Sequence, residues 1–428
     1  MYNTLIQILW IIASVMIFAS GIYFSLKLRF IHLNFKAMFK AITEKSNKKD
    51  SISSFQSLTM ALAGRIGVGS LSGIALAVYL GGPGVLFWIW FTSFFCATNA
   101  FAESVLAVIY RKKDSGNIYR GGPFYYISDG LGKQKLAILY AGIVLIAYIA
   151  GFLTIQVNTV SKCATEILNI NPIIIGIIAA VFTGMIIFGG VKKIAKTTSK
   201  LVPIMTGFYL LICTYIILVN LNMLPGIFKE IIDSAFNFKT FGTGVLSTLL
   251  IGMQKGIFSS ELGLGTGSIA AVTADASPKT SGLTQTFGIH IENLVIATIT
   301  TLVVCMSDYQ FLSLTDPNGI EITINAFRYH IGELGSLFIL ITITLFAFST
   351  LVTGYYYGES SLKFIKNTNR LEIFLLKIIT LVLLIIGSVM SSNTLWIIVD
   401  VLVGVIAIIN VYALFKLRKT VINSFIKF

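Results

Sequence analysis

Long uninterrupted runs of apolar residues constrain this chain more than any other feature. Residues 371–390 form one such run, and similar runs recur along the whole sequence. Of the 428 residues, 56% are hydrophobic and 12% are charged, whereas a soluble domain averages about a quarter charged residues. Because water would not keep such a surface dispersed, lipid must cover most of it. Transmembrane β-barrels alternate apolar and polar residues, so the continuous runs predict membrane-spanning helices instead.

Charged residues and Gly/Pro clusters divide these runs into eleven expected spans. They lie at residues 5–26, 54–80, 84–110, 136–160, 173–191, 201–220, 243–272, 282–306, 334–357, 371–390 and 394–415. The first run has no basic segment before it, which favours an uncleaved span over a signal peptide. No loop is long enough for a separate soluble domain, so we expect one all-α transmembrane domain, 1–428.

The distribution of lysine and arginine predicts the orientation. Of the 32 basic residues, 26 lie in one set of alternate loops, and two, Arg65 and Lys255, lie inside spans. The opposite side holds Lys162, Lys229, Lys239 and Arg328. Because basic loops stay in the cytoplasm, we expect a cell-membrane protein with its N-terminus outside and its C-terminus in the cytoplasm. This placement accounts for the net charge of +14 without a nucleic-acid partner.

The residue types argue against an enzyme, a metal centre or a cofactor. No GxSxG or HExxH pattern and no usefully spaced pair of catalytic aspartates occurs in the sequence. The four cysteines fall mostly in apolar runs without CxxC spacing, so they are interpreted as packing residues. They are Cys96, Cys163, Cys213 and Cys305.

Two of the expected spans are interrupted. Residues 64–73 and 256–267 are rich in glycine, and each glycine weakens a helix by roughly 1 kcal/mol. Close helix packing through small residues would explain the glycines, but it would not explain Arg65, Lys255 and Glu261 at membrane depth. Unwound backbone is tolerated there only when it lines protein or a water-filled cavity.

The interruptions occur five spans apart, each in the first helix of a five-span unit. This spacing predicts two inverted repeats, 54–220 and 243–415, preceded by an extra helix at 5–26. At the midplane, free amides at a half-helix N-terminus attract a carboxylate, and exposed carbonyls attract a cation. Paired broken helices suit a transporter with a closed midplane site better than a channel.

Eight stretches in order along the chain carry a family resemblance. They are 67–73 (GVGSLSG), 80–90 (LGGPGVLFWIW), 101–103 (FAE), 110–111 (YR), 121–127 (GGPFYYI), 256–265 (GIFSSELGLG), 346–350 (FAFST) and 356–359 (YYGE). The chain resembles the alanine or glycine:cation symporter family, also called the sodium:alanine symporter family. The resemblance implies a LeuT-type fold of the APC superfamily with one extra N-terminal helix. It also implies sodium-coupled import of alanine, glycine or a related amino acid.

Four positions depart from the family pattern and leave substrate preference open. The family usually has Asn at the positions of Ser70 and Ser260, Ala at that of Leu262 and, in many relatives, Thr at that of Arg65. Some relatives resemble glutamine carriers. A glutamine carrier, or proton coupling through Glu261 or Glu292, therefore stays open as an alternative.

The expected substrate site centres on the first interruption. Backbone amides of Gly67, Val68 and Gly69 would meet the substrate carboxylate, since glycine lets it approach closely. Ser70 is expected either to add a hydroxyl or to cap the helix after the break. The remaining candidates are Gln156, Phe258 and Ser259. Gln156 matches a Gln-x-Asn pattern of the family, although an amide near an outer end is also simply wetted, and Phe258 is either a pocket wall or core.

Oxygen atoms from two spans are expected to bind sodium. The resemblance assigns the hydroxyls of Ser349 and Thr350 and the carbonyls of Ala63, Ile66 and Phe346 to the ion. Neutral oxygens suit a weakly held hard cation, but the hydroxyls could instead bond back to carbonyls one turn earlier.

Arg65 and Glu261 are expected to pair across the two interruptions. Such a pair would lower the cost of burying both charges. Beyond the amino acid, sodium and the lipid bilayer, the sequence implies no obligate protein partner.

Overall fold

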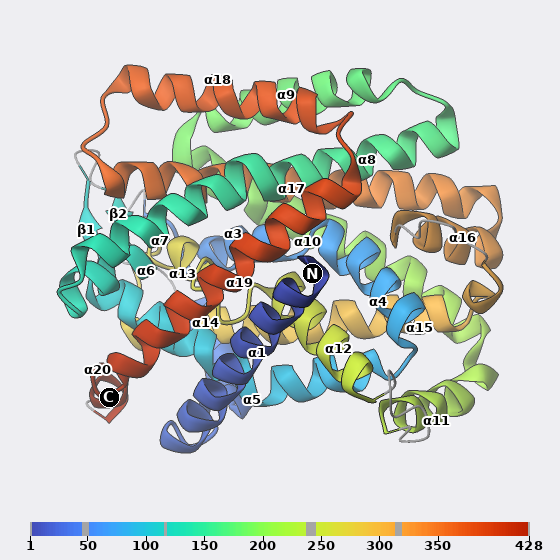
Figure 1. Ribbon diagram of the computed structural model, residues 1–428, viewed down its shortest axis with the longest axis horizontal. Helices are drawn as coiled ribbons and strands as arrows, with labels where there is room; N and C mark the ends of the chain where they lie inside the picture. Colours follow the sequence, from blue (N-terminus) through green and yellow to red (C-terminus); the bar gives the residue numbers. More distant parts are fainter. Residues whose placement is uncertain (1, 45–50, 115–117, 237–244, 313–318, 427–428) are drawn as a thin grey trace.

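The computed structural model describes residues 2–44, 51–114, 118–236, 245–312 and 319–426, which are almost wholly helical (Figure 1). The α-helices are α1 (Tyr2–Lys27), α2 (Phe35–Thr43), α3 (Ser54–Arg65), α4 (Ile74–Gly81), α5 (Val85–Ile109), α6 (Pro123–Tyr125), α7 (Gln134–Ile146), α8 (Leu153–Leu168), α9 (Pro172–Ile187), α10 (Gly190–Val219), α11 (Leu224–Ala235), α12 (Val245–Ser260), α13 (Gly267–Ala271), α14 (Pro278–His290), α15 (Ala297–Cys305), α16 (Gly319–Ile331), α17 (Glu333–Ile365), α18 (Arg370–Gly387), α19 (Ser392–Lys416) and α20 (Arg418–Ile426).

Short elements connect or interrupt these helices. Four are π-helical turns: η2 (Gly69–Gly73), η3 (Tyr126–Gly130), η4 (Ala147–Phe152) and η7 (Ile291–Ile296). Three are 3₁₀ turns: η1 (Ile31–Leu33), η5 (Leu221–Met223) and η8 (Tyr309–Phe311). An antiparallel pair of two-residue strands, β1 (Lys112–Lys113) and β2 (Tyr119–Arg120), lies in a connection between helices.

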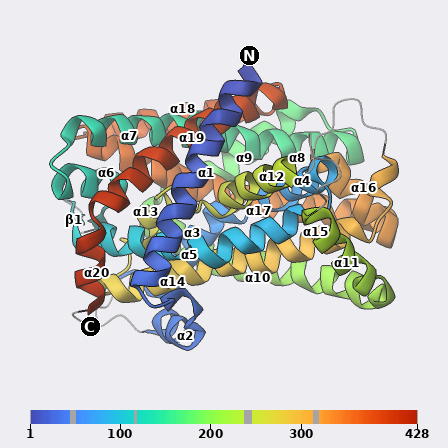
Figure 2. The same cartoon turned by 60° about the horizontal axis from the view of Figure 1, so that its bottom comes forward.

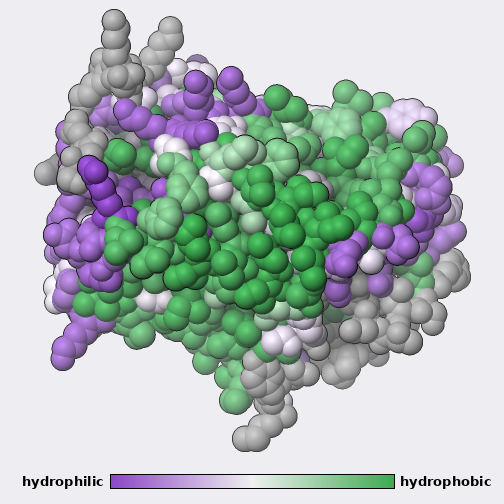
Figure 3. Space-filling model, turned by 90° about the horizontal axis from the view of Figure 1, so that it is seen from above, coloured by the Kyte–Doolittle hydropathy of each residue, from purple (hydrophilic) through white to green (hydrophobic). Residues whose placement is uncertain are grey.

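The described helices have the length and composition of a polytopic membrane protein. Seven continuous helical spans among the described residues are long and apolar enough to cross a membrane, two of them running through a π-helical turn (α7–η4–α8 and α14–η7–α15). The bent pair formed by α3 and the η2–α4 segment makes an eighth. Figure 3 shows a broad hydrophobic band across the middle of the molecule, with hydrophilic residues gathered at its two ends. The surface therefore matches a chain whose middle faces lipid and whose ends face water.

Several expected boundaries differ from the observed ones. α10 begins at Gly190, so the lysines of 192–200 lie on its first turns and not in a loop. α17 continues to Ile365, about two turns beyond the expected end. The basic start of α10 and the basic end of α17 are thus helical and extend beyond the apolar band. Residues 243 and 244 of the expected seventh span lie outside the described residues, and the number of eleven spans stays a prediction.

The segments expected on opposite sides of the membrane lie at opposite ends of the molecule. In Figures 1 and 2, β1 and α20 lie at one end, whereas α11 and α16 lie at the other. The first two belong to basic segments, and the last two carry Lys229 and Arg328. These four segments therefore lie at opposite ends of the molecule, as the predicted orientation requires, whereas Lys239 lies outside the described residues.

We expect Lys196→Cys to react with a membrane-impermeant maleimide only from the cytoplasmic side, and Lys229→Cys only from outside. Both lysines are exposed, and the four native cysteines are buried, so background labelling should be low. Labelling in intact cells and in permeabilised cells measures the sidedness. Reaction of Lys196→Cys in intact cells would overturn the predicted orientation.

Candidate functional site

The first interruption follows α3, a helix with a complete N-terminal capping box, and begins at a run of glycines. A capping box between Ser53 and Gln56 starts α3, which ends at Arg65. Ile66 then leaves the helical conformation with ψ of 85°, and the chain resumes as η2 and α4 with a bend of 54°. The predicted break at residues 64–73 is confirmed, and it frees backbone groups from regular helical pairing.

Gln156 of α8 contacts the backbone of this break directly. Its Oε1 atom accepts a hydrogen bond of 3.0 Å from the Val68 amide. The carboxamide oxygen therefore occupies one of the amides expected to hold a substrate carboxylate. The structure thus brings together Gln156 and Val68, which lie 88 positions apart in the sequence.

Four oxygens lie close together between α3 and α17. Thr350 Oγ1 donates to the Ala63 carbonyl at 2.9 Å and lies 3.1 Å from the Phe346 carbonyl. Ser349 Oγ lies 2.8 Å from the Phe346 carbonyl and 3.3 Å from that of Ala63. The two hydroxyls thus contact a carbonyl one turn earlier in α17 and also the Ala63 carbonyl of α3. All four residues are buried, and neutral oxygens of this kind are ligands that a hard monovalent cation accepts.

Gly67 lies between the amide and the group of oxygens. A Cβ atom at this position would lie 2.6 Å from Thr350 Oγ1 and 3.0 Å from Gln156 Oε1. Real Cβ atoms do not approach so closely, so only glycine fits without a shift of its neighbours. Gly67 therefore lies against both the expected substrate-binding group and the expected cation-binding group.

The second interruption is a segment with left-handed backbone conformations. α12 ends at Ser260, and Glu261, Gly263 and Gly265 follow with φ of 54°, 75° and 82°. Neighbouring helices hold the segment: Asn410 Nδ2 of α19 donates to the Gly263 carbonyl at 2.9 Å, and the Tyr140 hydroxyl of α7 donates to the Leu264 carbonyl. The predicted break at 256–267 is confirmed, although the regular helix continues to Ser260 and the left-handed backbone begins at Glu261.

Phe258 and Ser259 bring the end of α12 against the first break. Phe258 stacks on Phe152 with ring centroids 5.1 Å apart and also contacts Trp396. A Cβ atom at Gly69 would lie 3.5 Å from the Phe258 ring and 3.8 Å from Ser259 Cα. Phe258 therefore covers the glycine backbone of η2 as a buried core residue, and its role as a pocket wall stays a prediction.

Arg65 is buried between α13 and α14, and its predicted pairing with Glu261 is not a direct one. Its guanidinium donates to the Gln285 carbonyl at 3.3 Å, and no ion pair joins it to Glu261 in the described chain. Glu261 Oε1 instead accepts from the Tyr148 hydroxyl. The prediction considered only the two charges and missed Tyr148. A tyrosine within an apolar run does not indicate by itself that it will bind a buried acid.

Ser70 points toward an acidic residue on a third element. Its hydroxyl donates to Glu292 Oε1 at 2.6 Å, and Glu292 lies in the π-helical turn η7. The adjacent Asn293 donates through Nδ2 to Ser260 Oγ at 3.2 Å. η7 therefore contacts both interrupted helices, a contact for which the sequence offered only an acid within an apolar run.

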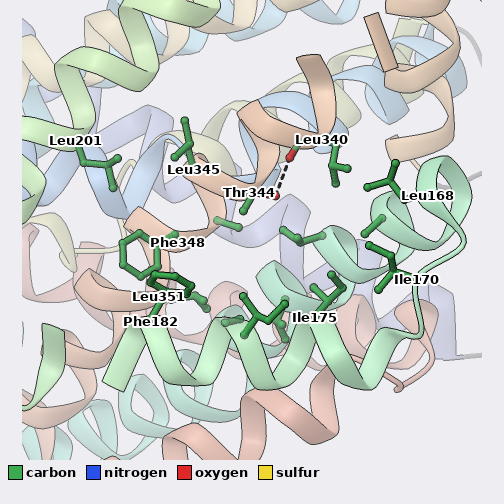
Figure 4. A pocket seen from close by; sticks show the side chains of 16 residues that line it. Leu168, Ile170, Ile175, Phe182, Leu201, Leu340, Thr344, Leu345, Phe348 and Leu351 are labelled. Atoms are coloured by element: carbon green, nitrogen blue, oxygen red, sulfur yellow. Dashed lines mark hydrogen bonds between the residues drawn. The ribbon is translucent and has the colours of Figure 1, made fainter. Parts of the chain in front are cut away.

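A separate cavity of about 460 Å³ lies among α8, α9, α10 and α17 (Figure 4). Its one polar side chain among the described lining residues is Thr344, whose hydroxyl donates to the Leu340 carbonyl at 2.6 Å. The lining includes Val157 and Phe348, which neighbour Gln156 and Ser349 in sequence. The cavity offers no free polar group to an amino acid, so the polar contacts at the two breaks make the better substrate site.

Comparison with known proteins identifies a family. A model described as the sodium:alanine symporter family matches residues 1–428, the whole chain. The probable sodium/glutamine symporter GlnT of Bacillus subtilis is 36% identical over 416 residues, covering 96% of this chain and 86% of that protein. The sodium/alanine symporter AgcS of Methanococcus maripaludis is 33% identical over 424 residues, covering 96% and 92%.

Solved structures agree at the level of fold. A manganese transporter of Eremococcus coleocola, in a mutant form, superposes with a TM-score of 0.57 at 13% identity and covers 87% of this chain and 80% of its own. This likeness concerns the fold alone, whereas the family model and the two relatives extend over nearly the full sequence. The chain therefore belongs to the sodium:alanine symporter family and is a multi-pass membrane transporter.

Proposed function

We propose that this transporter carries a small neutral amino acid, alanine or glycine, into the cell together with sodium. The observation that supports this most is Gly67, which lies between the Gln156 carboxamide and the Thr350 hydroxyl. A carboxylate that displaces the Gln156 oxygen from the Val68 amide, and that also reaches the amides of Gly67 and Gly69, would lie beside a cation held by the neighbouring oxygens. Each ligand then favours binding of the other through attraction of opposite charges.

The cation in this proposal is sodium, held by the carbonyls of Ala63, Ile66 and Phe346 and the hydroxyls of Ser349 and Thr350. Four of these residues contribute the oxygens grouped between α3 and α17. Ile66 joins them because its non-helical ψ turns its carbonyl away from the regular helix direction. Phe258 and Ser259 close the substrate side.

The proposal includes a five-plus-five inverted repeat, with the N-terminus outside and the C-terminus in the cytoplasm. The two interrupted helices belong to the second and seventh expected spans. This separation of five spans supports the repeat. The placement of β1 and α20 at one end and of α11 and α16 at the other supports the orientation.

A second candidate is glutamine transport by the same site. Ser70 and Leu262 lie in the two interruptions and depart from the residues usual in the family, and a glutamine symporter is among the relatives. Both candidates share the carboxylate and sodium positions, so they differ only in the side chain that the pocket accepts.

Uptake of labelled amino acids into proteoliposomes tests the proposal. We expect an inward sodium gradient to drive alanine or glycine accumulation, and we expect potassium to fail as a replacement. Ethylamine, which lacks the carboxylate, should not compete with alanine. Preferential uptake of glutamine would favour the second candidate, and absence of sodium-driven uptake across a panel of amino acids would contradict the proposal.

A further inference from the structure

The π-helical turn η7 places a buried carboxyl group where both interrupted helices meet. Glu292 is fully buried, and Ser70 Oγ donates to its Oε1 atom at 2.6 Å. Ser259, whose hydroxyl donates to the Gly256 carbonyl at 3.5 Å, also lies near this carboxyl. π-Helical turns often occur at functional sites, because the extra residue redirects side chains out of the regular helical pattern.

Two oxygens of η7 are left without hydrogen-bond partners. Among the described residues, neither Glu292 Oε2 nor Asn293 Oδ1 has a donor, although both side chains are fully buried. A buried acceptor without a donor is costly. A cation is the ligand that satisfies such oxygens, since carboxylate and amide oxygens bind hard cations well.

The charge of the surrounding residues gives an independent reason for a cation. The guanidinium of Arg65 acts on three buried carboxyl groups, those of Glu103, Glu261 and Glu292. One positive charge cannot balance three carboxylates, and an unbalanced carboxylate is expensive to bury. At least two of the three groups must therefore be neutralised by a bound proton or another cation.

Other ionisable groups on the elements around η7 do not supply this charge. The Tyr209 hydroxyl of α10 pairs with Thr300 at 2.8 Å, and Lys255 of α12 lies over Trp396, 5.0 Å from its ring centroid. His290 of α14 bonds to the His32 carbonyl at 2.8 Å. In η1, burial and then His290 lower the pKa of His32 to about 4, so His32 is neutral at physiological pH.

The other two acids near Arg65 serve the backbone of the second interruption. Glu103 Oε1 accepts from Asn410 Nδ2 at 2.8 Å, and the same nitrogen donates to the Gly263 carbonyl. Glu261 is part of the left-handed segment and accepts from Tyr148. Glu292 differs from both because it accepts a hydrogen bond from Ser70, beside the glycines of the substrate site.

We propose that Glu292 is a second cation-binding position, at which a proton or a sodium ion neutralises the carboxylate in each transport cycle. It is separate from the oxygens of Ser349 and Thr350, and it acts on the substrate site through Ser70. The inference rests on the proposed sodium-coupled uptake. It adds one coupled monovalent cation to that mechanism.

The final distribution of alanine across proteoliposomes measures this coupling without depending on transport rate. With the membrane potential clamped, each coupled cation adds about tenfold accumulation for a tenfold gradient of that cation. If Glu292 carries a proton, a pH gradient, acidic outside, should add this factor in the wild type and not in Glu292→Gln. If it carries sodium, accumulation should follow the square of the sodium ratio in the wild type and its first power in Glu292→Gln.

Controls separate a specific cation site from loss of a buried acid. Glu103→Gln removes a buried carboxyl group that does not contact Ser70. The number of cations that this variant couples to alanine should therefore match that of the wild type. Glu292→Asp keeps the ionisable group and should also keep the second coupled cation. If Glu292→Gln fails to insert, Glu292→Met, which is similar in size and cannot ionise, replaces it and should lose that cation. A wild-type distribution that follows one sodium and no proton would overturn the inference while leaving sodium-driven uptake intact. A second cation retained in Glu292→Gln would overturn it as well.

Discussion

Gly67→Ala should reduce amino-acid uptake by about 100-fold or more, because displacement of a positioning group by about 1 Å has effects of this size. The added Cβ atom would lie 2.6 Å from Thr350 Oγ1 and 3.0 Å from Gln156 Oε1. Thr350 can move away only by losing its bonds to the Ala63 and Phe346 carbonyls. The substitution therefore disturbs both proposed ligand positions at once. Initial rates in proteoliposomes at equal protein content measure the effect.

Gly73→Ala is the matched control for this experiment. Gly73 lies in the same interruption, at the end of η2, but a Cβ atom there would meet nothing within 4 Å. Its uptake should stay close to that of the wild type, and both variants should insert equally. Wild-type rates in Gly67→Ala would mean that the close approach does not persist during transport.

The double variant Ser349→Ala, Thr350→Val should lose most of its sodium activation. It removes two hydroxyl ligands while nearly preserving shape. A hydrogen-bond-like contact to a charge contributes roughly 1.5–3 kcal/mol, so the sodium concentration for half-maximal uptake should rise by about 100-fold or more. Initial uptake rates across a sodium titration, with ionic strength held constant, give this concentration.

Thr353→Val tests whether any buried hydroxyl of α17 has the same effect. Thr353 is fully buried, and its hydroxyl has no hydrogen-bond partner among the described residues. Its sodium titration should match that of the wild type. Unchanged sodium activation in the double variant would remove Ser349 and Thr350 from the cation site.

The two interruptions could be predicted because their cause is local. Dense glycine at 64–73 and 256–267, with charge at membrane depth, weakens a helix whatever packs around it. The adjacent hydroxyls of Ser349 and Thr350 were likewise visible in an otherwise apolar run. Their meeting with Ala63 required knowledge of which spans pack together, and the family resemblance supplied it.

The residues that hold the interruptions could not be predicted in the same way. Asn410 and Tyr140 reach the carbonyls of the second break from α19 and α7, and each is one polar group in a long apolar run. Pairing Arg65 with Glu261 followed from charge alone, whereas the direct partner of Glu261 is Tyr148. Helix boundaries also shifted where lysines continue a helix beyond the membrane, since hydropathy marks the edge of the lipid and not the end of the helix.

The burial of Arg65 restricts which residues can occupy two distant positions. A Cβ atom at Gly267 would lie 2.3 Å from Nη2 of Arg65, and one at Gly288 would lie 2.5 Å from Nη1. The guanidinium thus fills the volume that side chains at both positions would need. A relative with a small residue at position 65 is released from this restriction and can carry larger residues at 267 and 288. These three positions, on α3, α13 and α14, share one volume in the core. Their side-chain sizes should therefore co-vary among homologous sequences.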